Sequence, residues 1–372
     1  MKNNRILYVL NSNGVGGAEV SIKRMTTQHF KVASVVTLWD HPNAQVNFWN
    51  DLGPRYTHLL NKKLNLFTLL LAVFHLRKFI KRNDFSVIQT QLKGADVILG
   101  FLKMFHLINS NIILVASLRN SYGYYYKGSL ANKIFGLIHQ FLLKNYFDKV
   151  VVISLQDLDE FKSAFGLKLR VIENSIQKNS LAKDTNFPYN LKKLSIIMVG
   201  NIKFRKGYDK LLKFCDLLEV KGIKYEINIA GGVEDEDLLV EVLSKNNDLV
   251  NGKINYLGKV DDVFQELKSA DLFLSLSRDE GLPISVLEGM SVRLPMVLSG
   301  IQAHRLIIPD ISQHRVLFST IENAVELVFR KFQDQEALNV ELDAQQNLLN
   351  SRFDFETMCD KYDDVYQSEM TS

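Results

Sequence analysis

Residues 277–290 read Ser-Arg-Asp-Glu-Gly-Leu-Pro-Ile-Ser-Val-Leu-Glu-Gly-Met, and this stretch decides the fold. The residues before it, 271–276, alternate apolar and small side chains as a buried strand does. Pro283 suits the first turn of a helix, and apolar residues follow it at helical spacing. The stretch therefore predicts a strand, a loop and a helix in succession.

Two carboxylates, Glu280 and Glu288, stand in this stretch. On the predicted geometry, Glu280 lies in the loop at the carboxyl end of the strand. Glu288 lies about a turn and a half into the helix and faces the same crevice. Exposed glutamates near a helix start are also common on protein surfaces. The surrounding residues, rather than the carboxylates themselves, therefore favour a functional site.

Those surrounding residues resemble the signature of a known family, the retaining, nucleotide-sugar-dependent glycosyltransferases of family 4. The chain has Glu280-Gly281-Leu282-Pro283, Glu288-Gly289-Met290 and Pro295-Met296-Val297 where the family has Glu-Gly-Leu-Pro, Glu-Ala-Met and a Pro-Val strand. The resemblance implies a GT-B fold. It also implies that Glu280 and the backbone of Gly281 and Leu282 hold a donor sugar, and that Glu288 holds the ribose.

Length and composition agree with a large enzyme of the cytoplasm. A chain of 372 residues is too long for one ordinary core and fits two α/β domains. Cys215 and Cys359 are its only cysteines, too few for a disulfide framework. The first residues run into a predicted strand without the apolar region of a signal peptide. We therefore expect a cytoplasmic location.

Strand and helix signals alternate along the chain, which predicts parallel sheets with crossover helices. Residues 5–11 and 194–200 each lead into a loop and then a helix, so the chain starts the same way twice. We expect an α/β protein with two Rossmann-like, doubly wound domains facing across a cleft. The predicted domains are 1–178 on the acceptor side and 179–350 for the nucleotide sugar. The predicted linker lies within 174–193, and a last helix within 351–372 crosses back to the first domain, as in the family.

The glycine loop Gly14-Val15-Gly16-Gly17-Ala18-Glu19 follows the first strand. It resembles half of a dinucleotide-binding fingerprint, and Asp40 ends the next strand near where an NAD ribose acid would stand, so an oxidoreductase stays as an alternative. Glu19 occupies the place of the third glycine. Gly-Gly-Ala-Glu also resembles the family's own loop, in which Gly16 and Gly17 would close the donor site.

Residues 200–207 stand where the family has Gly-Arg-x-x-x-x-Lys-Gly, whose Arg and Lys hold the donor diphosphate. This chain keeps Gly200, Lys206 and Gly207 but has Asn201 in the place of the Arg, with Arg205 beside Lys206. A diphosphate leaving group needs its charge neutralised as the bond breaks. We therefore assign Lys206 to the diphosphate, with Arg205 as a substitute for the missing Arg.

Other positions depart from the family. Leu118-Arg119-Asn120 and Gln89-Thr90-Gln91 stand where the family often has histidines, and Leu306 replaces a glutamate. Arg119 and Asn120 are candidates for a phosphate of donor or acceptor, although an Arg at a strand end is also commonly a scaffold residue. His304 either hydrogen-bonds the sugar or plays no part in the site.

We expect no metal and no cofactor besides the nucleotide-diphospho-sugar co-substrate. Asp235-Glu236-Asp237 resembles the Asp-x-Asp of metal-dependent transferases, but it stands at a predicted helix start, where acids cap the helix. The histidines and cysteines do not form a ligand cluster in sequence.

Charge separates the two halves of the chain. Residues 1–178 carry 23 basic and 10 acidic residues, against 22 and 31 in the rest. A basic half predicts an anionic partner. Residues 59–82 and 122–149 mix lysines with apolar and aromatic residues, and neither is apolar enough to span a bilayer. They favour an anionic membrane surface over nucleic acid, although both patterns also fit the core faces of ordinary helices.

By resemblance, the chain is expected to be a retaining glycosyltransferase acting on a lipid-linked or other glycan acceptor in envelope polysaccharide synthesis (O-antigen, capsule or exopolysaccharide). It would bind the inner face of the cell membrane peripherally and leave it at high salt. The alternative, motivated by Asn201, Leu306 and the missing histidines, is a non-catalytic nucleotide-sugar-binding protein that partners another transferase.

Overall fold

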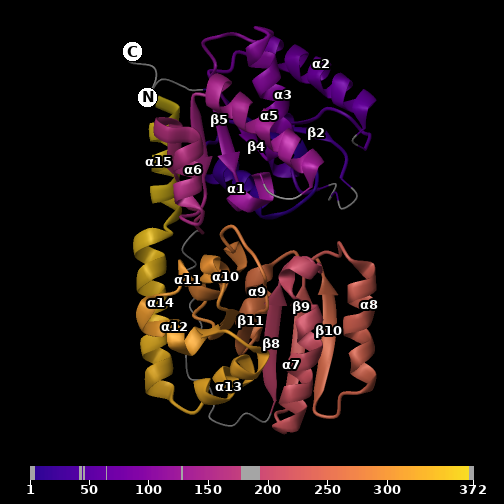
Figure 1. Cartoon of the computed structure of the whole chain (residues 1–372), viewed down its shortest axis with the longest axis vertical. Helices are drawn as coiled ribbons and strands as arrows, with labels where there is room; N and C mark the ends of the chain where they lie inside the picture. Colours follow the sequence, from indigo (N-terminus) through magenta and orange to yellow (C-terminus); the bar gives the residue numbers. More distant parts are fainter. Residues whose placement is uncertain are drawn as a thin grey trace. The chain divides into compact units, whose positions relative to one another are not determined.

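The computed structural model describes residues 5–41, 44, 47–63, 65–126, 129–176 and 193–367. The chain divides into two compact units, with boundaries after Asn174 and after Phe355. The amino-terminal unit holds the first segment and the last, and the carboxyl-terminal unit holds the segment between them (Figure 1). Most of the predicted linker, from residue 177 to 192, lies outside the described residues.

The amino-terminal unit is built on a parallel sheet of seven strands in the order β3-β2-β1-β4-β5-β6-β7. Its strands are β1 (Ile6–Ser12), β2 (Ser34–Trp39), β3 (Tyr56–His58), β4 (Val87–Gln91), β5 (Ile113–Leu118), β6 (Lys149–Val152) and β7 (Leu169–Val171). The central strands β4 and β5 are buried along their whole length, because helices cover both faces of a parallel sheet. In register, Leu7 pairs with Ser34 on one side and with Ile88 on the other.

Helices connect these strands. They are α1 (Gly17–Arg24), η1 (Met25–His29), η2 (Asn50–Arg55), α2 (Leu66–Arg82), α3 (Lys93–Met104), α4 (Tyr122–Tyr126), α5 (Leu130–Tyr146), α6 (Leu158–Phe165), η3 (Gly166–Lys168) and, from the end of the chain, α15 (Phe355–Gln367). Helix α3 packs between α2 and α5, so these three form one layer. We call α2, α3 and α5 the basic helix layer.

Helix α15 is anchored in the core of the amino-terminal unit. The hydroxyl of Tyr366 lies 3.1 Å from that of Tyr8 on β1 and also donates to Gln89 on β4. Tyr362, one turn earlier, is buried as well. The last helix of the chain therefore belongs to the same unit as the first strand, although 358 positions separate Tyr8 from Tyr366.

The carboxyl-terminal unit holds a six-stranded parallel sheet in the order β10-β9-β8-β11-β12-β13. Its strands are β8 (Leu194–Val199), β9 (Tyr225–Ala230), β10 (Gly252–Gly258), β11 (Leu272–Ser275), β12 (Met296–Ser299) and β13 (Leu317–Phe318). Its helices are η4 (Phe204–Lys206), α7 (Asp209–Val220), α8 (Glu236–Ser244), η5 (Lys245–Asn247), α9 (Val263–Ser269), α10 (Ile284–Ser291), α11 (Gln302–Arg305), α12 (Asp310–Val316), α13 (Ile321–Lys331) and α14 (Gln335–Arg352).

Both sheets reverse their strand order at the first strand of the unit. In the amino-terminal sheet the reversal lies between β1 and β4, and in the carboxyl-terminal sheet it lies between β8 and β11. Ligands of open α/β sheets bind at the carboxyl ends of the strands beside such a reversal. The fold therefore gives each unit one preferred place for a ligand, and the two repeated starts of the chain stand at these places.

Candidate active site in the carboxyl-terminal unit

The loop after β8 brings Lys206 to the reversal point of the carboxyl-terminal sheet. Gly207 adopts a left-handed conformation with φ 75°, and a Cβ there would stand 2.1 Å from the carbonyl oxygen of Leu276. A Cβ on Gly200 would stand 3.1 Å from Lys206 Cε, so the lysine stem passes closely over this glycine. Gly207 is therefore required by the close approach of the β8 loop to Leu276, directly after β11, and Gly200 leaves room for the lysine stem.

Glu280 is the centre of a buried polar cluster. Its carboxylate is 5% exposed and accepts hydrogen bonds from Lys206 Nζ at 2.5 Å and from Ser277 Oγ at 2.8 Å. Arg205 Nη1 lies 3.5 Å from its other oxygen. Burial acts to raise the pKa of Glu280, but the charges of Lys206 and Arg205 outweigh it and hold the pKa below its usual value. Glu280 is therefore ionised at neutral pH.

Arg205 completes the cluster from the more exposed side. Its Nη1 donates to the carbonyl oxygen of Asp279 at 2.9 Å, and about a third of its side chain is exposed. The structure thus brings Arg205 and Lys206, which are neighbours in sequence, to Glu280, which lies 74 positions after Lys206. Two cations and one anion give the cluster a net positive charge, which suits a negatively charged ligand.

The other residues proposed for the donor lie on the same strand-loop-helix segment. Gly281 follows Glu280, Leu282 is buried, and Glu288 is nearly buried on α10. Helix α10 packs closely on the sheet at Gly289, where a Cβ would stand 2.7 Å from Met296 Cε. The predicted loop and helix are confirmed by these elements, and the donor roles of the three residues stay predictions.

Asn201 has a structural task in this site. Its Oδ1 accepts from the backbone N–H of Gly232 at 2.9 Å, and its Nδ2 donates to Glu234 at 2.8 Å. Both ends of the amide therefore join the β8 loop to the β9 loop. Asn201 consequently shapes the loop that carries Lys206, and its contact with the donor stays a prediction.

His304 is fully buried near this cluster. Its Nδ1 lies 2.7 Å from the carbonyl oxygen of Ser299, so Nδ1 carries the proton and donates it there. Burial lowers the pKa of His304 to about 4, which keeps the ring neutral. The sequence alone gave only a weak indication that His304 lies near the site. Ser277, which binds Glu280, was missed as a site residue although it stands inside the opening stretch, three positions before Glu280.

The glycine loop of the amino-terminal unit is closed by its own glutamate. Gly16 precedes the first turn of α1, Gly17 begins the helix, and Glu19 Oε2 accepts from the N–H of Gly16 at 3.0 Å. Burial raises the pKa of Glu19. Asp40, the candidate ribose acid of an oxidoreductase, instead bonds Asn13 and His58. These contacts give the dinucleotide interpretation no support.

Arg119 and Asn120 follow β5 in the amino-terminal unit. Arg119 is buried beside Gln91, the last residue of β4, and its backbone N–H donates to Tyr125 OH at 3.0 Å. The side chain of Asn120 bonds the hydroxyl of Tyr125 as well. The two residues therefore fix helix α4 against the carboxyl end of the sheet.

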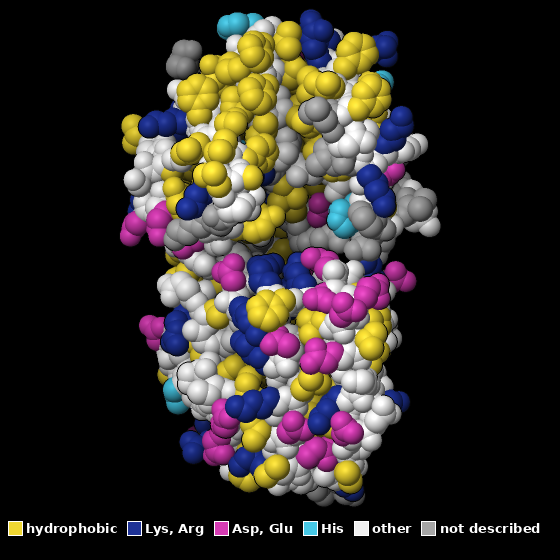
Figure 2. Space-filling model, turned by 45° about the vertical axis from the view of Figure 1, so that its right-hand side comes forward, with side chains coloured by type: hydrophobic (Ala, Val, Ile, Leu, Met, Phe, Trp, Pro, Cys, Tyr) yellow, Lys and Arg dark blue, Asp and Glu magenta, His cyan; other side chains and the backbone are white. Residues whose placement is uncertain are grey.

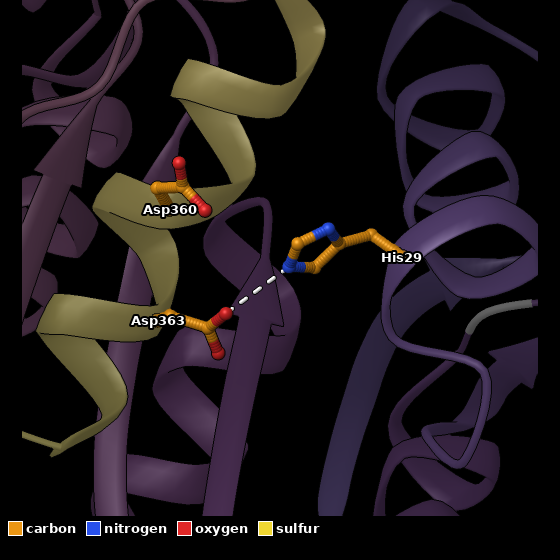
Figure 3. Close-up of side chains that lie close together, drawn as sticks. All are labelled: His29, Asp360 and Asp363. Carbon is orange, nitrogen blue, oxygen red and sulfur yellow. Dashed lines mark hydrogen bonds and ion pairs between the residues drawn. The ribbon is translucent and has the colours of Figure 1, made fainter. Parts of the chain in front are cut away.

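One group of metal-ligating side chains gathers in the described part of the chain, at His29, Asp360 and Asp363 (Figure 3). His29 ends η1, and the two aspartates lie one turn apart on α15. His29 Nε2 is 3.0 Å from Asp363 Oδ2, and its Nδ1 is 3.3 Å from Glu356 Oε2. Both ring nitrogens of His29 already face carboxylates, so these polar contacts connect η1 to α15.

Asp235 caps α8 by accepting from the N–H of Leu238, which confirms its predicted structural role.

The helices of the basic helix layer are rich in apolar residues. Within the described residues, no helix combines the length and the apolar character that crossing a bilayer requires.

The family described as glycosyl transferases group 1 matches residues 182–339, which lie in the carboxyl-terminal unit. An uncharacterized glycosyltransferase of Haemophilus influenzae is 26% identical over 302 residues, which is 78% of each chain. The O-antigen biosynthesis glycosyltransferase WbnH of Escherichia coli is 24% identical over 234 residues, 62% of this chain and 63% of that protein.

A further relative and a solved structure are also similar to this chain. The N,N'-diacetylbacillosaminyl-diphospho-undecaprenol alpha-1,3-N-acetylgalactosaminyltransferase of Campylobacter jejuni is 24% identical over 63% of this chain and 64% of its own length. The crystal structure of HepE from Anabaena in complex with UDP-glucose is similar in fold, with a TM-score of 0.79 and 16% identity over 98% of this chain and 99% of HepE. The chain is therefore a glycosyltransferase of the GT-B fold whose carboxyl-terminal unit carries a glycosyl transferases group 1 domain.

Proposed function

We propose that this protein transfers a sugar from a nucleotide-diphospho-sugar to a hydroxyl of a lipid-linked glycan, with retention of the anomeric configuration. The observation that carries the proposal is the cluster of Lys206, Arg205 and Glu280 at the reversal point of the carboxyl-terminal sheet. It offers two cations for a diphosphate and one ionised carboxylate for sugar hydroxyls.

Lys206 supplies most of the leaving-group stabilisation. Its Nζ is held by Glu280 and is largely shielded from solvent, so it is aimed before substrate arrives. Charge develops on the diphosphate as the glycosidic bond breaks, and a fixed cation in a dry site stabilises that charge without reorganisation. Arg205 is more exposed, and its guanidinium group can turn toward the same diphosphate.

Glu280 orients the donor sugar. Its lowered pKa keeps it an acceptor of hydrogen bonds, and sugar hydroxyls are donors. Ser277 fixes one of its oxygens, which leaves the carboxylate little rotational freedom. No side chain is assigned as a nucleophile, so the proposed retention requires the acceptor hydroxyl to attack from the face that the diphosphate leaves. The new glycosidic bond then forms as the bond to the diphosphate breaks, and the hydroxyl proton passes to the departing diphosphate. Positioning and electrostatics then account for the rate.

The acceptor class comes from the relatives. The name of the Campylobacter jejuni relative states that it acts on a sugar linked to diphospho-undecaprenol, and that of WbnH states O-antigen biosynthesis. We therefore propose a diphosphate-linked lipid glycan of an envelope polysaccharide as acceptor. These names also favour a transferase over the non-catalytic alternative.

The basic helix layer supports attachment to the inner face of the cell membrane. Eleven large apolar side chains are exposed on it or directly after it: Phe67, Leu70, Phe74, Phe101, Phe105, Leu130, Ile134, Phe135, Leu137, Ile138 and Phe141. Figure 2 shows hydrophobic side chains gathered on this unit. The three helices carry eight basic residues and a single acidic one, Asp96, which is buried against His139 at 2.7 Å. Every exposed charge on the layer is therefore positive, which suits an anionic lipid surface.

These apolar side chains change the expected salt dependence. A large apolar side chain contributes about 1.5–3 kcal/mol when fully buried, against roughly 1 kcal/mol for a Lys or Arg near an anionic surface. Six of the eleven lie on α5, which carries only Lys133 and Lys144. Apolar insertion therefore outweighs attraction on this helix, and we propose that attachment persists at high salt rather than being released by it.

The transfer reaction is tested with a panel of nucleotide sugars and a short-chain diphosphate-linked glycan acceptor. One donor should raise the melting temperature and release its nucleoside diphosphate only when acceptor is present. Proton NMR of the product then gives the anomeric configuration. A product of inverted configuration contradicts retention, and the absence of turnover with every donor contradicts the proposed transfer.

A further inference from the structure

Arg119 occupies the ligand-binding edge of the amino-terminal sheet. It follows β5, and its neighbour Gln91 ends β4, the strand beside the reversal point. Its Nη1 lies 3.5 Å from Ser21 Oγ in α1, the helix that follows the glycine loop. Three segments of the amino-terminal unit therefore meet around one guanidinium group.

This guanidinium is buried but only partly hydrogen-bonded. Arg119 is 8% exposed. Its Nε donates to Gln91 Oε1 at 2.7 Å, and its Nη1 donates to Asn174 Oδ1 at 2.5 Å. Its Nη2 has no hydrogen-bond partner among the described residues, so two N–H groups are unused. Buried donors of this kind are ordinarily satisfied by protein, water or a bound group, so these N–H groups call for a partner.

Gln91 adds a further unused donor beside Arg119. Because its Oε1 accepts from Arg119, its Nε2 must point away as a donor. Nε2 is buried and, within the described part of the chain, has no partner. The two side chains are bonded to each other, so their free N–H groups belong to one small region.

Among the described residues, the guanidinium of Arg119 has no hydrogen-bonded carboxylate. The side-chain oxygens that hold the guanidinium belong to neutral groups: the amides of Gln91 and Asn174 and the hydroxyl of Ser21. Glu19 is near enough for the charge of Arg119 to act to lower the pKa of Glu19, but burial has the larger effect and raises that pKa. The Oε2 atom of Glu19 accepts a hydrogen bond from the N–H of Gly16. In the described residues no ion pair joins Arg119 to a carboxylate. A buried guanidinium held only by neutral groups calls for an anion from outside.

We propose that Arg119 Nη2 and Gln91 Nε2 form a second anion-binding subsite, which takes an oxyanion of the substrate: a phosphate or a sugar carboxylate. Both atoms are N–H donors, and one of them carries positive charge, which are the properties that an oxyanion requires of its partners. This deepens the proposed function, on which its assignment to a substrate rests. The binding itself does not depend on catalysis, because the subsite lies wholly within the amino-terminal unit.

The test measures oxyanion binding after the carboxyl-terminal site is disabled. In the full chain with Lys206→Ala and Arg205→Ala, calorimetric titrations use inorganic pyrophosphate, glucuronate and, as an uncharged control, glucose. We expect one saturable site for pyrophosphate or glucuronate and none for glucose. A preference for pyrophosphate identifies a phosphate as the natural group, and a preference for glucuronate identifies a sugar carboxylate.

Two substitutions in this background test whether the site is the one proposed. Arg119→Lys keeps the positive charge but lacks the Nη2 donor of the guanidinium group. We expect the affinity for the oxyanion to fall at least tenfold. Gln91→Glu gives Arg119 an internal carboxylate, so oxyanion binding should fall similarly while the melting temperature rises. Asn50→Asp, which adds a negative charge to the surface of the same unit, is the control and should change neither.

The outcomes separate this inference from the proposed function. Absence of oxyanion binding in the Lys206→Ala, Arg205→Ala background overturns the subsite, and so does binding that is unchanged by both Arg119→Lys and Gln91→Glu. Binding that these two substitutions abolish supports the subsite even if the wild-type protein transfers no sugar, because catalysis is measured separately.

Discussion

The outer helices α7, α8 and α13 of the carboxyl-terminal unit carry eight acidic and four basic residues, whereas the basic helix layer carries one acidic and eight basic. In the first set, charges of both signs pair with each other, as Lys213 does with Glu322 at 2.5 Å and Arg330 with Glu326 at 2.8 Å. The exposed large apolar residues there are few: Val220, at the end of α7, Val240 and Phe329.

The buried charges differ in the same way. In the carboxyl-terminal unit, Lys331 pairs with Glu341 at 2.6 Å and Lys206 with Glu280. In the amino-terminal unit, Arg119 is held by neutral side chains. Both units are parallel sheets covered by helices, so the architecture does not cause these differences. The two units show that the same architecture can pair its charged groups with one another, or can hold them so that they remain available to a ligand or a membrane surface.

The largest expected effect comes from removing the best-paired cation. Lys206→Ala should lower kcat by roughly 10²–10³-fold, because it removes a fixed donor to the leaving group. It should also lower the melting temperature, since Glu280 is left buried without its main partner. Nucleoside diphosphate release and thermal unfolding measure the two effects.

The matched control is Lys203→Ala. Lys203 lies on the same loop and pairs with Glu234 at 2.9 Å, but this pair is partly exposed. Both kcat and melting temperature should stay near the wild-type values. If Lys203→Ala lowered kcat as much as Lys206→Ala, the role given to Lys206 would be contradicted.

The second effect concerns the two helix layers. Ile134→Asp with Leu137→Asp places two carboxylates on the exposed face of α5, and we expect affinity for anionic vesicles to fall at least tenfold. Val220→Asp with Val240→Asp makes the same change on the carboxyl-terminal unit and should leave affinity unchanged. Vesicle sedimentation at low and high salt measures both pairs. Wild-type binding that vanishes at high salt would show that attraction, not insertion, dominates.

The third effect is the pH dependence of stability, to which the neutral His304 contributes. Its pKa is about 4 in the folded protein and 6.5 in its ordinary state, so the unfolded chain takes up the proton first as pH falls. The contribution of His304 to the free energy of unfolding is fully present above pH 6.5. It falls by about 3 kcal/mol in total as the pH is lowered from 6.5 to 4. Chemical denaturation at several pH values measures it.

His304→Gln should remove that part of the pH dependence, and His314→Gln, on the surface of α12, should leave it in place. A wild-type slope in the His304→Gln variant would assign the dependence to other groups.

The smallest expected effect is that of a chelator. We propose that Lys206 and Arg205 do the work of a cation at the diphosphate, so EDTA should change the transfer rate by less than about twofold. The His29 group in the amino-terminal unit gives a specific alternative. If EDTA abolishes activity and magnesium or manganese restores it, His29→Ala would then show whether that group is responsible.

Several features of this protein could be predicted from the sequence because they depend on local patterns. Alternating apolar runs and glycine loops predicted parallel α/β units, and the two repeated chain starts are the reversal points of the two sheets. The stretch 277–290 predicted the loop with Glu280 and the helix with Glu288, because Pro283 and the apolar spacing act over a few residues. Family resemblance, not periodicity, added Lys206.

The chain alone could not show which side chains satisfy one another. Asn201 was predicted to contact the donor, but its partners Gly232 and Glu234 come from the next strand's loop. The apolar residues of 122–149 fitted a core face as well as a membrane face, and only the packing of α5 on α3 decided which of them stay exposed.

The sequence by itself determined the fold class, the position of the signature carboxylates and the basic character of the first half, because each is set by residue type and short-range spacing. The tertiary structure decided that Lys206 lies on Glu280, that two N–H groups of Arg119 have no partner among the described residues, and that the apolar face of α5 is exposed. These depend on contacts between residues far apart in the chain, whose partners are chosen only when strands and helices pack.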